Sequence, residues 1–215
     1  QPSQADYFQT VKGGGHGDYR LIALAPASVQ EMADFVGLAF DLAFKYRNPA
    51  IILADGVIGQ MMEKVVLPEQ RPRLTNEEVM ARCPWATFGK LKHRGPNIVT
   101  SLELDPAEME KRNIHLQQKY AEIEEKEVRY EEIHCDDAEY LIVAFGSCAR
   151  IAQKAMEEAR AEGIKVGLLR PITLWPFPSK AIAERSRQVK GILTVELNAG
   201  QMVEDVRLAV ECKVP

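Results

Sequence analysis

Two apolar runs, residues 21–25 and 50–54, are joined by a segment with helical periodicity. Ser28 is followed three residues later by Glu31, the spacing of a capping box, and this predicts the start of a helix. Apolar residues then recur every three or four positions, as Met32, Phe35, Val36, Ala39, Phe40 and Ala43. A strand that is apolar on both sides must be covered on both sides. The pattern therefore predicts an α/β fold built on a parallel sheet.

The length and composition are those of an ordinary globular chain. Its 215 residues suffice for one large domain or two small ones, and 46% of them are hydrophobic. The formal net charge is −4, so neither nucleic acid nor an anionic membrane is expected as a partner. We identify no run near the ~18 apolar residues of a membrane span and no signal-like segment. We expect a soluble protein with no nucleic-acid or membrane partner.

The four cysteines are Cys83, Cys135, Cys148 and Cys212, and they are far apart in the sequence. Their spacing matches neither CxxC nor a Cys/His ligand set. Disulfide pairing stays open, but free thiols in a reduced cytoplasm are favoured. Any iron–sulfur or zinc centre would be held by another chain. The chain also starts at Gln1, which suggests a piece of a longer protein.

The middle of the chain has a different composition. Five prolines between residues 64 and 106 predict a long connector. Asp105 and Pro106 then predict a helix start, and residues 107–132 hold neither glycine nor proline. We expect one long exposed helix there, whose charges form a solvated face rather than a binding strip.

The last third returns to alternating strands and helices, which predicts a second, smaller α/β domain. The expected order is strand 140–145, turn 146–148, helix 149–162 and strand 164–169, followed by a helix after residue 178, strand 191–196 and a final helix near residue 201.

Residues 13–20, GGGHGDYR, form a glycine-rich loop directly before the first strand. Glycine permits positive φ and a close approach of other groups. His16 and Asp18 lie in this loop, and ligands of α/β proteins usually bind at loops that flank core strands. The alternative is a mobile turn with a solvated His16.

Three other segments leave alternatives open. The turn at 146–148 could hold a phosphate or be a plain turn, since it lacks a Walker lysine. Residues 170–178, with Trp175 and Phe177, could form an exposed apolar surface against a neighbour or a packed loop, and we favour the surface. Residues 196–202 could contact a ligand or be capped by Asn198.

Cysteine-based catalysis is not supported. Cys148 has no partner in the sequence that would activate it. His134 and Cys135 are neighbours, and adjacent strand residues point to opposite faces, which argues against a dyad. We therefore exclude a hydrolase.

Taken together, these residues resemble the alpha subunit of 2-oxoacid:ferredoxin oxidoreductases, closest to the 2-oxoisovalerate (branched-chain) type and next to the 2-oxoglutarate type. The resemblance spans nearly the whole chain. It rests on residues 1–8, GGGHGDYR, APASVQEM at 25–32, KYRNP at 45–49, LADG at 53–56, Arg150, Gly163, RPITLWPFP at 170–178 and residues 196–202.

The resemblance implies three parts: 1–66 as the C-terminal part of a pyrimidine-type thiamine diphosphate domain, 67–136 as a linker with the long charged helix, and 137–215 as a transketolase-C-like domain. It implies oxidative decarboxylation of a 2-oxoacid to an acyl-CoA, with electrons passed to ferredoxin. Thiamine diphosphate, Mg²⁺ and iron–sulfur clusters would be held mainly by partners. These are a beta subunit and gamma and ferredoxin-like delta subunits, with coenzyme A as co-substrate.

In this resemblance the glutamate that activates the cofactor lies upstream, so no catalytic residue is assigned and the fragment alone should be inactive. His16 and Asp18 would line the approach of substrate or coenzyme A, and Gly14, Gly15 and Asp55 are weaker candidates for cofactor contact. Two alternatives stay open: a non-catalytic assembly module, and a transketolase or the beta chain of a lipoate-linked 2-oxoacid dehydrogenase.

Overall fold

The computed structural model describes residues 2–89, 92–93 and 95–215, so Gln1, which opens the first predicted part, lies outside the described residues. The chain divides into two compact units, residues 1–67 with 120–215, and residues 68–119. The second unit contains the short helix α3 (Asn76–Arg82), and Thr75 and Glu78 form a capping box at its N-terminus. Helix α4 (Pro106–Lys126) begins in this unit and ends in the first.

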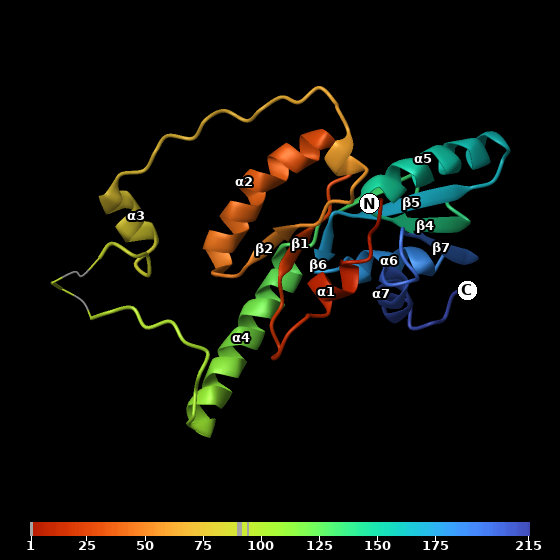
Figure 1. Ribbon diagram of the computed structural model, residues 1–215. Helices are drawn as coiled ribbons and strands as arrows, with labels where there is room; N and C mark the ends of the chain where they lie inside the picture. The colour runs from red at the N-terminus through yellow and green to blue at the C-terminus, as the bar shows by residue number, and fades with distance from the viewer. Residues whose placement is uncertain (1, 90–91, 94) are drawn as a thin grey trace. The chain divides into compact units, whose positions relative to one another are not determined.

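The first sheet has three strands in the order β2-β1-β6. Strands β1 (Ile22–Leu24) and β2 (Ala50–Ile52) are parallel, with Ile22 opposite Ala50, which confirms the prediction. Helix α2 (Val29–Tyr46) connects them and packs on both (Figure 1). The sheet is not purely parallel, because β6 (Thr173–Trp175) pairs antiparallel with β1.

The start of α2 differs from the prediction in one detail. Ser28 Oγ accepts the backbone N–H of Glu31, as expected for a cap. The Glu31 side chain does not return to Ser28, however. It accepts the N–H of Ala27 and is also bound to Arg170, so a distant arginine decides where this carboxylate points.

The second sheet has the order β3-β5-β4-β7. Strands β4 (Tyr140–Ala144), β5 (Val166–Pro171) and β7 (Gly191–Val195) are parallel, and β3 (Tyr130–Ile133) runs antiparallel to β5. Helix α5 (Gly146–Ala161) lies on one side, and α6 (Ser179–Ser186) and α7 (Met202–Ala209) lie on the other (Figure 1). The core beneath α5 contains Ile142, Ala144, Ala152, Met156 and Leu168.

One continuous segment belongs to both sheets. Residues of β5 pair with β4 in the second sheet, and after Ile172 the chain pairs with β1 in the first sheet as β6. The N–H of Ala25 donates to the carbonyl of Ile172, which extends the pairing past β1. The two sheets are therefore joined through backbone hydrogen bonds within one compact unit.

Two predicted boundaries were wrong. The long helix ends at Lys126 instead of residue 132, because the chain then forms β3 against β5. Residues 146–148 are the first turn of α5 rather than a separate turn. The sequence analysis also missed α1 (Tyr7–Val11), the 3₁₀ turn η1 (Ile58–Gln60), α3, β3 and β6, all seven residues or shorter.

Within the part of the chain that the structure describes, no helix is both long enough and apolar enough to cross a membrane.

Replacing Met156 tests the core under α5. Met156 is 1% exposed, so Met156→Ala should lower the free energy of unfolding by about 2–5 kcal/mol through the cavity it leaves. Ile151 lies on the same helix but is 64% exposed, and Ile151→Ala should change stability by at most about 0.5 kcal/mol. Chemical denaturation followed by circular dichroism measures both. Equal losses would contradict the assignment of the buried face.

Candidate functional site

The glycine-rich loop closes on its own tyrosine. The backbone N–H groups of Gly14 and Gly15 both donate to the hydroxyl of Tyr19, at 2.8 and 2.9 Å. His16 and Asp18 are exposed. Two adjacent N–H groups that meet at one oxygen form a small anion-binding arrangement, here filled by a phenol. The loop thus offers an exposed imidazole and carboxylate, while its two adjacent backbone donors are bound by Tyr19.

Asp55 is 5% exposed and its carboxylate contacts three separate segments. Oδ1 accepts the backbone N–H groups of Val57 and Ile58 at 3.0 and 3.1 Å. Oδ2 accepts the N–H of Ser147 at 2.9 Å and the side-chain amide of Gln4 at 3.2 Å. Both oxygens are therefore used within the chain, and we propose a structural role for Asp55 in place of the predicted cofactor contact.

This carboxylate occupies the N-terminus of α5. Burial disfavours the charged form of Asp55, but hydrogen bonds from the N–H groups of Ser147 and Ile58 outweigh it, so the pKa lies below its usual value. A helix N-terminus attracts anions, and here the anion belongs to the protein. The segment 146–148 is therefore not an open phosphate turn.

Glu196 fills the N-terminus of α7 in the same way. Its carboxylate accepts the N–H groups of Gln201, Met202 and Val203 at 2.8–3.1 Å. Asn198, the predicted cap, instead accepts from Gly200 and donates to the carbonyl of Gln4. Glu196 could not be recognised as the cap from the sequence, because a glutamate six positions before the helix matches no standard capping spacing.

The aromatic segment 170–178 is packed, so the expectation of an exposed surface was wrong. Trp175 is 7% exposed and its ring meets that of Tyr120 edge-on, with centroids 5.6 Å apart. Phe177 is half-buried. The physical reason is that residues 173–175 form β6 against β1, which turns this segment into the core. We do not retain Trp175 as an interface residue.

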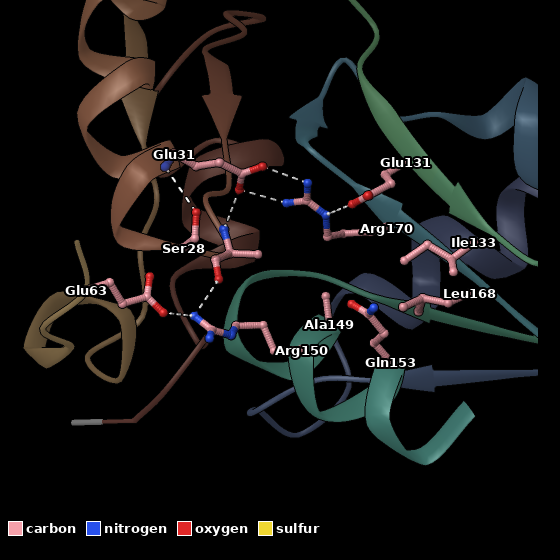
Figure 2. Close-up of a pocket in the computed structure, with 11 residues that line it drawn as sticks. Ser28, Glu31, Glu63, Glu131, Ile133, Ala149, Arg150, Gln153, Leu168 and Arg170 are labelled. Carbon is pink, nitrogen blue, oxygen red and sulfur yellow. Dashed lines mark hydrogen bonds and ion pairs between the residues drawn. The ribbon is translucent and has the colours of Figure 1, made fainter. Parts of the chain in front are cut away.

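A cavity of about 280 Å³ lies where α2, α5 and β5 meet, and it is lined by charged side chains (Figure 2). Arg170 donates both terminal nitrogens to Glu31, at 2.9 and 2.7 Å, and its Nε to Glu131 at 2.9 Å. Arg150 donates to Glu63 at 2.6 Å and to the carbonyl of Ala27 at 3.4 Å.

The charged side chains that line this cavity do not favour an anionic ligand. Three carboxylates face two guanidinium groups in the lining, and Figure 2 shows each arginine directed at a glutamate. The bidentate Arg170–Glu31 pair fixes geometry as well as energy. In the sequence, the Ser28–Glu31 spacing was the only indication of this cluster. That spacing predicts a helix cap and does not predict the contact with Arg170.

The two buried thiols, Cys135 and Cys148, are unsuited to nucleophilic catalysis. Burial raises the pKa of Cys135 and of Cys148 to about 11, so both stay protonated at neutral pH. All four cysteines are free. Among residues 2–89, 92–93 and 95–215, no group of three or more His, Cys, Asp or Glu side chains could hold a metal ion.

The Glu31–Arg170 pair should matter more than its neighbour in the same cavity. The Arg170 side chain is 8% exposed, so Glu31→Ala leaves a buried charge short of partners and should cost about 3 kcal/mol of stability. Glu63→Ala removes a partner of Arg150, which is 43% exposed, and should cost at most about 1 kcal/mol. Thermal and urea unfolding of both variants would reveal the difference, and a larger loss for Glu63→Ala would refute it.

Comparison with known proteins identifies the family to which the chain belongs. The family model described as "Pyruvate flavodoxin/ferredoxin oxidoreductase, thiamine diP-bdg" matches residues 1–134. The model "Pyruvate:ferredoxin oxidoreductase core domain II" matches residues 138–215. Together they cover both sheets.

Curated relatives align along nearly the whole chain. Ketoisovalerate oxidoreductase subunit VorB of Methanothermobacter marburgensis is 52% identical over 99% of the chain. 2-oxoglutarate synthase subunit KorA of Archaeoglobus fulgidus is 33% identical, again over 99%. The chain spans 58% and 60% of the length of these two relatives.

A solved structure shares the fold. It is 2-oxoglutarate:ferredoxin oxidoreductase from Magnetococcus marinus with 2-oxoglutarate, coenzyme A and succinyl-CoA bound, and it matches with a TM-score of 0.74 at 21% identity. The match covers 99% of this chain and 40% of that one. The predicted α/β class is thereby confirmed. With both family models and a relative at 52% identity, the chain belongs to the 2-oxoacid:ferredoxin oxidoreductase family, as its sequence predicts.

Proposed function

We propose that this chain is part of the alpha subunit of a thiamine diphosphate-dependent 2-oxoacid:ferredoxin oxidoreductase. The reaction would be oxidative decarboxylation of a 2-oxoacid, with 2-oxoisovalerate as the favoured substrate, to an acyl-CoA with electrons passed to ferredoxin. The observation that carries the proposal is the 52% identity, over 99% of the chain, to a relative named as a ketoisovalerate oxidoreductase subunit.

Within this protein we propose the division into 1–66, 67–136 and 137–215, and the junction of the two family models between residues 134 and 138 supports its second boundary. His16 and Asp18 would line the approach of substrate or coenzyme A. Their support is their exposure in a loop that the hydrogen bonds from Gly14 and Gly15 to Tyr19 hold closed. The free cysteines agree with a reducing cytoplasm.

The N-termini of α2, α5 and α7 do not fit the diphosphate of the cofactor. A diphosphate is typically bound at a helix N-terminus, but the N-termini of α5 and α7 are occupied by the carboxylates of Asp55 and Glu196. At the start of α2, the N–H of Val29 is bound by Glu63. We therefore assign the diphosphate, Mg²⁺ and the iron–sulfur clusters to partner chains, namely a beta subunit and gamma and ferredoxin-like delta subunits. When bound there, the cofactor supplies the carbanion chemistry of decarboxylation.

One observation favours an additional assembly role. Val36, Phe40 and Phe44 are 48%, 63% and 52% exposed and are spaced four residues apart on α2. Residues at this spacing lie on one face of a helix, and a stripe of this kind is typical of a contact surface. An assembly role and a catalytic role are compatible, and a measurement of turnover distinguishes them.

The test is coenzyme A-dependent, anaerobic reduction of a viologen dye by the full-length chain co-expressed with its neighbouring subunits. Reduction with 2-oxoisovalerate, and much less with 2-oxoglutarate or pyruvate, is expected. An assembled complex that contains thiamine diphosphate and clusters but reduces the dye with none of the three would overturn the enzyme proposal and leave the assembly role.

In that complex, His16→Ala should lower kcat/KM by about tenfold, because an exposed imidazole on the approach path would be lost. His115→Ala, which removes an exposed imidazole from α4, should have no effect. Subunit content, measured by mass spectrometry, should be the same in both variants. A loss of assembly with normal turnover per intact complex would argue against the role of His16.

A further inference from the structure

Asp55 joins three segments that are distant in the sequence. Through Oδ1 it caps the turn η1, and through Oδ2 it meets the start of α5 and Gln4. Oδ2 therefore reaches 51 residues back and 92 residues forward along the chain. A single buried carboxylate with four donors is rigidly placed, because each donor would otherwise be left unpaired.

Gln4 carries the connection further. Its side-chain amide also donates to the carbonyl of Phe145 at 2.9 Å, and its Oε1 accepts the N–H of Leu197 at 3.1 Å. Its backbone N–H donates to the carbonyl of Leu197, and its carbonyl accepts from Asn198. The segment that begins with Pro2 is thereby fixed to the turn that follows β7.

Gly146 shows how tightly this junction is packed. It has a φ of +58°, and a Cβ placed on it would lie 2.8 Å from both Asp55 Oδ2 and Gln4 Nε2. No side chain fits there without parting the two groups. Gly163 also has a positive φ, of +85°, but a Cβ there meets nothing within 4 Å.

A cavity of about 260 Å³ lies next to this junction, and its walls are segments that Asp55 holds. It is lined by Pro2, Gly56, Val57, Gln60 and Met61. It follows β2 in the chain, and ligands of α/β proteins bind beyond the carboxyl ends of parallel strands. None of the described residues that line it carries a charged side chain, so it suits an uncharged aliphatic group better than a second carboxylate.

We propose that Asp55 is a positioning residue, which holds Pro2 and the residues 56–61 at the separation needed for this cavity to take the aliphatic end of the 2-oxoacid. The substrate part of this inference rests on the proposed function. The positioning part does not, because it concerns only how these two walls are held.

The experiment uses the co-expressed complex with Asp55→Asn, Gly146→Ala and the milder Gln4→Met. Asp55→Asn turns an acceptor into a donor facing other donors, and Gly146→Ala parts the junction without removing a polar group. Gln4→Met keeps the side-chain length but removes the amide. The matched control is Gly163→Ala, which also places a Cβ at a positive φ but meets nothing within 4 Å.

Hydrogen–deuterium exchange of peptides covering residues 2–8 and 56–61 is the first readout. The three junction variants should exchange there about tenfold faster, the loss expected for one or two hydrogen bonds, while Gly163→Ala matches the parent chain. Unchanged exchange in these peptides would overturn the positioning role. This readout decides the point even when the complex shows no turnover.

The second readout is the steady-state kinetics. In Gln4→Met, KM for 2-oxoisovalerate should rise about tenfold while kcat and KM for coenzyme A stay within about twofold. A fall in kcat alone, or equal shifts in KM for both substrates, would show that the cavity does not take the 2-oxoacid. A complex that reduces no dye with any 2-oxoacid would instead count against the proposed function.

Discussion

The passage of one extended segment from the second sheet into the first is the constraint on which the rest of this structure depends. β5 is buried along its length, and two residues after it ends the same segment begins β6 against β1. Arg170, at the end of β5, is held by Glu31 from α2 and by Glu131 from β3. Backbone pairing and this bidentate ion pair fix the same junction, so the two sheets form one unit rather than two hinged domains.

A second theme is that carboxylates of the chain itself occupy the N-termini of α2, α5 and α7. Asp55 serves α5, Glu196 serves α7, and Glu63 accepts the first N–H of α2. Each arrangement satisfies backbone donors that would otherwise be exposed or unpaired. It also removes these termini as sites for phosphate groups. This is the structural reason for proposing that partner chains, rather than these helix N-termini, hold the diphosphate.

Much of the fold could be predicted from local pattern. The apolar runs at 21–25 and 50–54 did form parallel strands, and the helix between them begins at the predicted cap, Ser28. The prediction failed where tertiary pairing decided the outcome. Residues 127–133 continue the charge pattern of α4, yet the antiparallel contact with β5 makes residues 130–133 a strand. Trp175 looked exposed because nothing in its own segment shows that β1 lies beside it.

The candidate site was predictable only in part. A glycine cluster with His16 and Asp18 can be recognised in sequence, because glycine and ionisable residues have local meanings. The junction of Gln4, Asp55 and Gly146 cannot, because its members are 51 and 91 residues apart and none stands in a motif for its role. Likewise, Glu31 was read as a local cap, while its partner Arg170 lies 139 residues away.

The most direct test of the account is native-state hydrogen exchange on the first compact unit within the full chain. If β6 joins the sheets into one cooperative structure, the amides of β1 and of β4 should share the same free energy of opening, and Leu174→Gly in β6 should lower both together. Exchange of β1 through a separate opening of much lower free energy, with β4 unaffected by the substitution, would show two independent domains and contradict the account.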